Sequence, residues 1–196
     1  MRLKEKPQGA GGSSFQLIDA EKVLEELHLK KGNTFLDMAC GQGEYAIEFS
    51  NIVGEDGLIY AVDLWDENIV QLRKAVSGAW IKNIKAIVAD VSKVMPIGND
   101  SVDVCLMATV LHDLILEKAA DEAIKEAARV LKPNGLLAII EFKKIDGPPG
   151  PPLKIRLNPN EVESIVTSFG FIKKEVKEVG EYNYLMTFDL GKSDKP

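Results

Sequence analysis

Short hydrophobic runs alternate along the chain with longer amphipathic stretches. The hydrophobic runs predict buried strands at 34–38, 58–62, 84–89, 102–108 and 136–142. The amphipathic stretches predict helices at 20–29 after Asp19 as N-cap, at 44–52, from the N-cap candidate Asp66 to about 78, and at 117–131. Strands that alternate with helices in this way are typical of a parallel sheet whose strands are joined by crossover helices.

The last third of the chain has a different pattern. Prolines and glycines fill Gly147–Pro152, which excludes a helix there and predicts a rim loop or lid. A helix is expected over 160–169, followed by strands at 171–179 and 182–190. Because only Gly180 and Glu181 separate the two strands, we expect them to form an antiparallel hairpin.

The most informative segment is Phe35–Ala46, where the first strand runs into an acidic residue and a glycine-rich turn. Gly41 and Gly43 permit a tight bend and a close approach of the backbone to a ligand. The predicted helix that follows directs its amino end to the same point. Gly41-x-Gly43-x-x-Ala46, with Asp63 20 positions after Gly43, also satisfies the dinucleotide-binding fingerprint. The turn therefore fits two ligands, a dinucleotide or S-adenosylmethionine (SAM).

Charge separates these two ligands. A dinucleotide brings an anionic pyrophosphate to the turn, whereas SAM brings a sulfonium and an ammonium. Asp37 and Glu44 flank the turn. Opposite charges a few ångströms apart attract by roughly 4 kcal/mol at an intermediate dielectric, so the acidic flanks favour SAM.

The segment Asp37-x-Ala39-Cys40-Gly41-x-Gly43 resembles motif I of the class I SAM-dependent methyltransferases. Later segments resemble the same family in the expected order, at 58–63, 84–91, 101–108 and 130–142. Within the family, the likeness is greatest to small-molecule members of the type 11 and quinone-biosynthesis kind. The resemblance implies an α/β fold, a Rossmann-like three-layer sandwich. Its mostly parallel seven-stranded sheet would have the order 3-2-1-4-5-7-6 and a C-terminal antiparallel hairpin.

The resemblance also implies how SAM is held. Asp37 would fix the methionine end, Asp63 would accept hydrogen bonds from the ribose hydroxyls, and Asp90 would accept one from the adenine amino group. The implied cofactor-binding residues are Asp37, Ala39, Gly41, Gly43, Asp63, Leu64, Trp65, Ala89, Asp90, Val91 and Ala108. Each has a structural alternative, since an aspartate at a strand end is often a cap or turn former and Trp65 can serve in packing.

The acceptor side is marked by Leu111-His112-Asp113, directly after the fourth predicted strand. His112 is the candidate catalytic base, because the other histidine, His28, lies on a predicted surface helix. A role in lining the pocket is the alternative for His112. Further side chains expected at this mouth are Asp113, Glu141, Tyr182 and Tyr184, each as a group that orients the acceptor or as plain wall.

The reaction implied by the resemblance is transfer of a methyl group from SAM to a small-molecule acceptor by in-line displacement. The fourth strand is followed by Ala108-Thr-Val-Leu rather than the Asn/Asp-Pro-Pro-Tyr/Phe of members that methylate nucleobase or glutamine amino groups. Two other functions stay open at this point. One is a SAM-binding partner or sensor without turnover, and the other is a nicotinamide-dependent oxidoreductase.

Composition agrees with one globular domain of 196 residues. The net charge is −6 with both signs mixed along the chain, which predicts no nucleic-acid partner. No apolar run reaches the roughly 18 residues of a membrane span, and the polar start at Met1–Lys6 lacks a secretory signal core, so a cytoplasmic location is expected. Cys40 and Cys105 have no C-x-x-C spacing and are predicted to be buried free thiols, with no metal site.

These observations divide the chain into a flexible amino-terminal segment at 1–18, a SAM-dependent methyltransferase domain at 19–190 and a disordered tail at 191–196. The segment Phe15–Leu17 is expected to be exposed, and either to cover the cofactor or to pack on a neighbouring copy in a homo-oligomer.

Overall fold

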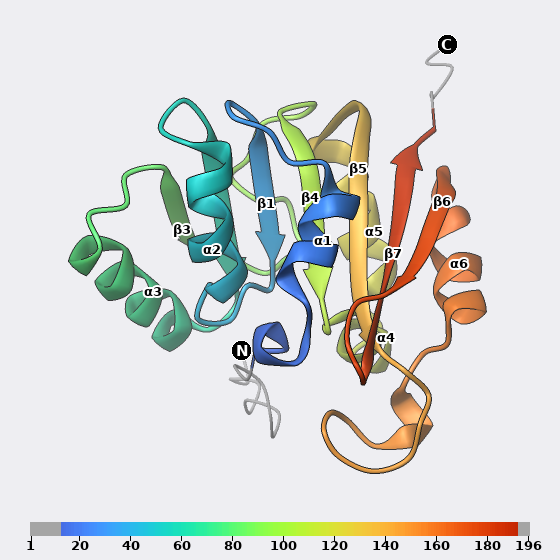
Figure 1. Cartoon of the computed structure of the whole chain (residues 1–196). Coiled ribbons are helices and arrows are strands. Elements are labelled where there is room, and N and C mark those ends of the chain that lie inside the picture. The colour runs from blue at the N-terminus through green and yellow to red at the C-terminus, as the bar shows by residue number, and fades with distance from the viewer. Residues whose placement is uncertain (1–12, 192–196) are drawn as a thin grey trace, which may run out of the picture.

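The computed structural model describes residues 13–191. Its centre is a seven-stranded sheet of order β3-β2-β1-β4-β5-β7-β6 (Figure 1). The strands are β1 (Thr34–Met38), β2 (Leu58–Asp63), β3 (Ile84–Val88), β4 (Val102–Ala108), β5 (Leu131–Phe142), β6 (Phe171–Glu178) and β7 (Asn183–Leu190). β1 to β5 pair in parallel, and β7 pairs antiparallel with both β5 and β6. This topology confirms the predicted fold class.

Helices cover both faces of the sheet and complete a three-layer sandwich. α1 (Ala20–Leu27), α2 (Glu44–Val53) and α3 (Asp66–Gly78) pack on one face. α4 (Leu111–Leu116), α5 (Ala120–Val130) and α6 (Pro159–Thr167) pack on the other. Short 3-10 helices, η1 (Phe15–Leu17) and η2 (Leu153–Ile155), precede α1 and α6. The chain therefore crosses from one face to the other between α3 and α4.

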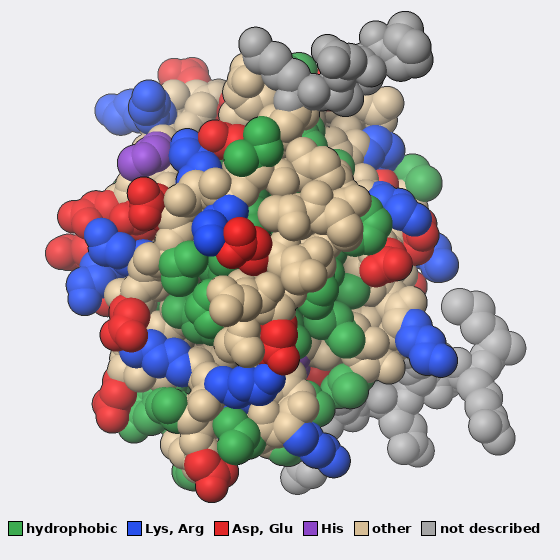
Figure 2. Space-filling view, turned by 90° about the vertical axis from the view of Figure 1, so that its right-hand side faces the viewer, with side chains coloured by type: hydrophobic (Ala, Val, Ile, Leu, Met, Phe, Trp, Pro, Cys, Tyr) green, Lys and Arg blue, Asp and Glu red, His purple; other side chains and the backbone are tan. Residues whose placement is uncertain are grey.

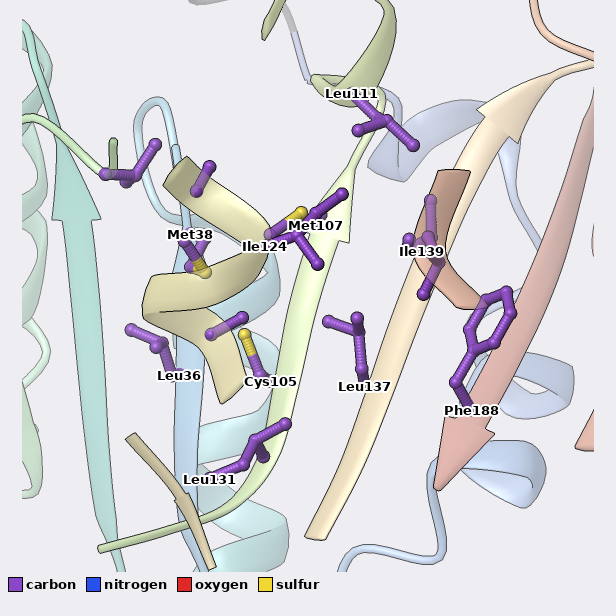
Figure 3. Close-up of a cluster of buried hydrophobic side chains, with 14 of the residues drawn as sticks. Leu36, Met38, Cys105, Met107, Leu111, Ile124, Leu131, Leu137, Ile139 and Phe188 are labelled. Atoms are coloured by element: carbon purple, nitrogen blue, oxygen red, sulfur yellow. The ribbon is translucent and has the colours of Figure 1, made fainter. Parts of the chain in front are cut away.

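Side chains of the central strands alternate between these two layers. In β1, Phe35 contacts the layer of α1 to α3, whereas Leu36 and Met38 contact the opposite layer, as a period of two residues requires. Figure 3 shows Leu36, Met38 and Cys105 close to Ile124 of α5. Cys40 and Cys105 are both free and buried, as predicted.

The region between β4 and β5 differs from the prediction. The helix expected at 117–131 corresponds to α5, which begins at Ala120, and a short helix that was not predicted, α4, precedes it. Lys118, with a left-handed φ of 56°, separates the two helices. β5 begins at Leu131 rather than at 136, and the residues up to Gly135 form an irregularity opposite β4, where the register shifts between Val102 and Val104. A bulge of this kind tolerates the proline at 133, which a regular ladder would exclude.

Two predicted helix starts have different outcomes. The Asp19 side chain accepts a hydrogen bond from the Lys22 amide and caps α1, as expected. Asp66, in contrast, is the first helical residue of α3, and the N-cap position belongs to Trp65. No side chain caps α3, and the Asp63 carboxylate instead accepts from the amide of the N-cap residue, Trp65, at 2.8 Å.

Residues 14 and 15, in the segment predicted to be flexible through residue 18, pack against α2. Ser14 is buried, and its Oγ atom lies 2.9 Å from the hydroxyl oxygen of Tyr45 on α2. The ring of Phe15 meets the Tyr45 ring edge-on at 5.0 Å. Residues 1–12 and 192–196 lie outside the described part of the chain. Of the predicted tail, Gly191 is described, and its amide donates to the Gly170 carbonyl at 3.0 Å.

The proline-rich stretch forms a loop at the carboxyl end of β5, near α4 in Figure 1. Its centre is Arg156, whose side chain is buried and donates hydrogen bonds of 2.6–3.2 Å to main-chain carbonyls. The accepting residues are Lys143, Ile145, Gly147, Pro149 and Pro151. The loop is thus tied down by one guanidinium.

Figure 2 views the molecule from the side of β6, and basic and acidic side chains are interspersed over this face. Ile172 and Val176 of this edge strand are exposed among charged neighbours. Charged residues on an edge strand oppose unwanted pairing with another chain. Within residues 13–191, no helix has the length and apolar character needed to cross a membrane.

Candidate cofactor and acceptor cleft

A cleft opens at the carboxyl ends of β1, β2 and β4. Its empty volume, including the solvent at its mouth, is about 1090 Å³. After β1 the chain turns to α2 on one face, and after β4 it turns to α4 on the other. Such a reversal between neighbouring parallel strands creates the crevice in which open α/β sheets bind ligands. The lining residues are Ser13, Ser14, Asp37, Ala39, Cys40, Gly41, Tyr45, Asp63, Leu64, Trp65, Asp90, Val91, Ser92, Ala108, Thr109, Val110, Asp113, Leu114, Glu117 and Ala119.

The backbone is unusual at the two strand ends that frame this crevice. Ala39 after β1 has a φ of 58°, and Thr109 after β4 has a φ of 51°. Non-glycine residues in the left-handed region cost on the order of 1 kcal/mol or more and tend to collect at binding sites. Both residues line the cleft, so the irregular backbone coincides with the site.

Asp37 is the most deeply buried acid of the cleft, with 1% of its surface exposed. The pKa of its carboxyl is raised to about 7, because burial and, to a smaller extent, the charge of Asp63 raise it by more than the amide hydrogen bond from Ala46 lowers it. Its Oδ2 atom has no hydrogen-bond partner among the described residues. A buried acceptor atom without a donor costs free energy, and a cationic ligand in the cleft would supply the missing partner.

Asp63 is tied into the protein more tightly than the sequence indicates. Its Oδ2 atom accepts from the Gly41 amide at 2.8 Å, and its Oδ1 atom accepts from Trp65 and from Asn68 at 2.8 and 3.1 Å. A carboxylate offers about four acceptor positions. Asp63 therefore joins the glycine turn to the start of α3 and retains room for about one further donor.

The two glycines of the turn have different surroundings. Gly41 lines the cleft, whereas Gly43 is buried behind it as the N-cap of α2, with a φ of 78°. A Cβ atom on Gly43 would lie 2.5 Å from Cδ1 of Leu72 in α3. Gly43 thus serves the packing of α2 against α3, and it is not among the described residues that line the cleft.

The end of β3 contributes a turn. Asp90 accepts hydrogen bonds from both the amide and the hydroxyl of Ser92, at 2.9 and 2.6 Å, and lines the cleft together with Val91. Leu64 and Trp65 lie on the cleft wall as well. Ala89 is not among the described lining residues, and its amide donates to the Asp63 carbonyl at 2.9 Å. Most of the predicted cofactor residues are therefore brought together, with Gly43 and Ala89 behind the wall.

His112 does not reach the cleft wall. Its side chain is 5% exposed, and its Nδ1 atom lies 2.8 Å from Oε2 of Glu141, which is fully buried in β5. Burial lowers the pKa of His112, but the hydrogen bond and the charge of Glu141 raise it by more, so the net shift is upward. The expected base is thus a buried partner of a carboxylate, and the next residue, Asp113, is the one that lines the cleft.

The tyrosines expected at the acceptor mouth lie elsewhere. The Tyr184 hydroxyl donates to the Leu157 carbonyl at 2.8 Å, and neither Tyr182 nor Tyr184 is among the described residues of the lining. In their place the cleft has Ser14 and Tyr45 at one end and Leu114 of α4 at the other. Leu111, Leu114 and Ile115 have the spacing of one helix face, but the six residues of α4 are too few for this spacing to predict a helix by itself.

In the described residues, no group of three His, Cys, Asp or Glu side chains is arranged to hold a metal ion.

A family described as "Methyltransferase domain" matches residues 36–139, more than half of the chain. The crystal structure of a SAM-dependent methyltransferase from Aquifex aeolicus superimposes with a TM-score of 0.83 and 34% identity, over 91% of this chain and 93% of that one. These matches cover the strands and turns that frame the cleft.

Two similar relatives have assigned methyltransferase activities. The ubiquinone/menaquinone biosynthesis C-methyltransferase of Azotobacter vinelandii is 31% identical over 127 residues, which cover 62% of this chain and 47% of that protein. Demethylmenaquinone methyltransferase from Staphylococcus aureus is 26% identical over 170 residues, 87% of this chain and 66% of that protein. The chain spans about half the length of the first of these. The family match, the sheet order and the closely similar Aquifex structure show that this chain belongs to the class I SAM-dependent methyltransferases.

Proposed function

We propose that the protein transfers a methyl group from SAM to a small-molecule acceptor. The observation that carries the proposal is the Asp37 carboxylate, which lines the cleft, is almost fully buried and has one oxygen without a partner. A carboxylate in this state fits a cationic ligand group, and SAM carries an ammonium and a sulfonium. The activity of the quinone-biosynthesis relatives supports a small-molecule acceptor.

Different residues of the cleft bind different parts of SAM. Asp37 pairs with the ammonium of the methionine end. Asp63 accepts from one ribose hydroxyl through its remaining acceptor position, and Asp90 accepts from the adenine amino group. The other wall residues in contact with the cofactor are Ala39, Gly41, Leu64, Trp65, Val91 and Ala108, with Gly43 and Ala89 supporting the wall from behind.

When bound, SAM supplies a methyl group that its sulfonium has already activated. The protein has to hold the acceptor in line and keep water away, and orientation of this kind can contribute about 7 to 11 kcal/mol. Val110 and Leu114 give the acceptor end of the cleft apolar walls that exclude water. His112 acts in this proposal as a positioning residue for α4, through its hydrogen bonds to Glu141.

A cytosolic location is part of the proposal. Both cysteines are free and buried, which suits a compartment that keeps thiols reduced.

Isothermal titration with SAM and with its demethylated product tests the cofactor site. We expect micromolar binding of both to the wild-type protein and no binding of NAD, and weaker binding to Asp63→Asn. Labelled SAM incubated with a panel of small phenols, quinols and amines then tests transfer. If the folded protein binds neither SAM nor its product, the proposal fails.

A further inference from the structure

The loop that follows β5, residues 143–156, projects from the edge of the sheet at which the cleft opens. Figure 1 shows it beyond the carboxyl ends of the parallel strands and next to α4. The cleft is lined by residues at these same strand ends and by residues of α4. A surface that binds the loop is therefore brought to the mouth of the cleft.

The main chain of this loop leaves few polar groups for water. Arg156 donates hydrogen bonds to five main-chain carbonyls between Lys143 and Pro151. The four prolines between 148 and 152 have no amide hydrogen. Irregular backbone is normally kept out of apolar surroundings, because its unpaired polar groups are costly there. In this loop much of that cost is removed by the protein itself.

Apolar side chains point outward from this fixed main chain. Ile145 and Leu153 are 42% and 40% exposed, and Pro148 and Pro152 are exposed as well. Both aliphatic residues adjoin Arg156, because the Ile145 carbonyl accepts from its guanidinium at 2.7 Å and the Leu153 carbonyl accepts from its amide at 3.2 Å. The loop thus presents apolar groups to the solvent from one held position.

The charge of the loop is opposite to that of the whole protein. Residues 143–156 contain four lysines or arginines and one acid, a net charge of +3 (4 − 1), whereas the chain carries −6. Lys143 and Lys144 form ion pairs with acids of β6 and α6. Lys154 is exposed and has no ion-pair partner among the described residues. A lysine beside exposed apolar groups suits a surface that is anionic at its boundary and apolar beneath.

The same features disfavour a protein as the partner. Main-chain hydrogen bonds carry many contacts between proteins and extended segments, but the carbonyls of this loop are largely taken by Arg156. Lysine is also depleted at protein interfaces. A lipid surface makes neither demand.

We propose that residues 143–156 bind the surface of an anionic lipid bilayer. Ile145 and Leu153 enter the boundary between headgroups and acyl chains, and Lys154 pairs with headgroup phosphates. The mouth of the cleft then lies at the bilayer. This inference goes beyond the proposed methyl transfer and does not depend on it.

Sedimentation with lipid vesicles tests the inference on the full-length protein. The vesicles contain either phosphatidylcholine alone or equal parts of phosphatidylcholine and phosphatidylglycerol. Because the whole chain is acidic, its net charge opposes binding to the mixed vesicles, so binding there reports a local surface. We expect the wild type to bind the mixed vesicles, and to bind phosphatidylcholine alone about fivefold more weakly.

Variants separate the apolar contribution from the charged one. Changing both Ile145→Asp and Leu153→Asp should lower the partition coefficient on mixed vesicles about tenfold or more. Lys154→Gln should lower it about threefold to fivefold on mixed vesicles, with little change on phosphatidylcholine alone.

The matched control for the apolar pair lies on β6. Ile172 and Val176 are 61% and 42% exposed, and changing both to aspartate removes equivalent side chains outside the loop. Lys82→Gln, at an exposed position before β3, is the control for Lys154. Both controls should bind vesicles as the wild type does. Thermal unfolding and titration with S-adenosylhomocysteine establish that each variant is folded.

Three results overturn the inference. The first is no binding of the wild type to mixed vesicles, and the second is an equal loss in the loop variants and their controls. The third is a change in oligomeric state of the loop variants in light scattering without vesicles, which would make the loop a contact between copies of the chain. Failure of S-adenosylhomocysteine binding in the wild type would count against the proposed function and leave the vesicle result unaffected.

Discussion

The buried acids on the two sides of the cleft differ in whether the protein supplies them with hydrogen-bond donors. On the cofactor side, Asp37 is buried at the wall with an oxygen that has no partner in the described chain. On the acceptor side, Glu141 is buried away from the wall and accepts from the ring and the amide of His112 and from the Phe142 amide. A buried acid that the protein satisfies contributes to stability, whereas one that it leaves unsatisfied stores a cost that a ligand can remove.

The largest expected effect is a loss of stability on the acceptor side, at the pair of His112 and Glu141. His112→Ala leaves Glu141 buried without its cationic partner, and breaking a buried pair in this way typically costs about 3 to 5 kcal/mol. Urea unfolding should show this loss, while titration should show little change in SAM affinity. Because the folded pKa of His112 lies above 6.5, the contribution should be complete below pH 6.5 and fade as the pH rises through the folded value.

A double-mutant cycle controls this prediction. Adding Glu141→Gln removes the unpaired charge and should recover part of the lost stability. A loss below about 1 kcal/mol in His112→Ala, which is the range of an exposed ion pair, would contradict the assignment of this pair to stability.

The second-largest effect is expected at Asp37 on the cofactor side, where the substitution should stabilise the empty protein rather than destabilise it. The pKa of Asp37 is raised from 3.8 to about 7, so ionised Asp37 makes the empty protein less stable as the pH rises through this interval. Three pKa units correspond to about 4 kcal/mol. Asp37→Asn should therefore stabilise the empty protein at pH 8 by up to about 4 kcal/mol in urea unfolding, and weaken SAM binding in titration.

Asp56→Asn, at an exposed turn position, is the matched control and should change neither quantity. If Asp37→Asn lowers stability instead, Asp37 is an acid that the protein stabilises, as it does Glu141, and the contrast between the two sides disappears.

A smaller effect is expected behind the cofactor side, at Gly43. Alanine there would be strained by the φ of 78° and would meet Leu72 at 2.5 Å, so Gly43→Ala should cost about 1 to 3 kcal/mol in thermal unfolding. Gly78→Ala is the control, because no atom lies within 4 Å of its added Cβ. That variant should be neutral or gain up to about 1 kcal/mol. Equal effects of the two changes would show that the α2 and α3 packing does not depend on Gly43.

The smallest effect is the pH dependence of cofactor binding. In the proposed binding mode SAM pairs with ionised Asp37, whose pKa is raised to about 7 in the empty protein. Affinity should fall about tenfold for each pH unit below 7, which is about 1.4 kcal/mol per unit, and level off above it. Titration from pH 5.5 to 7.5 measures this slope. Asp37→Asn should abolish it, and a flat wild-type profile would show that Asp37 does not face the ammonium.

The same contrast explains what the sequence predicts well. The cofactor side is built from strand ends, and a hydrophobic run followed by an acid locates Asp37, Asp63 and Asp90 without knowledge of the packing. Side-chain partners are not encoded in such a local pattern. The amides that Asp63 accepts from and the contact of Gly43 with Leu72 depend on how α2 and α3 come together.

The acceptor side is harder to predict from the sequence, because its helix is short and its contacts join residues that are far apart in the chain. α4 spans only Leu111–Leu116, less than two turns, which is too little for a clear amphipathic period. His112 and Glu141 are 29 positions apart. The titratable ring of His112 and its position after the fourth strand therefore predicted a place in the cleft, whereas the pairing of β4 with β5 brings the ring to a buried carboxylate.

Arg156 constrains the length of the loop beside α4 more than it constrains the sequence of that loop. Its partners are carbonyl oxygens of alternate residues from Lys143 to Pro151, and every amino acid has such an oxygen. Apart from Gly147 and Gly150, whose positive φ angles restrict them, the outward side chains can be exchanged while the ring of carbonyls persists. An insertion or deletion would break that ring. This loop is therefore a place where related proteins can diverge in composition at constant length, and where surface properties near the cleft can be redesigned without unfolding the domain.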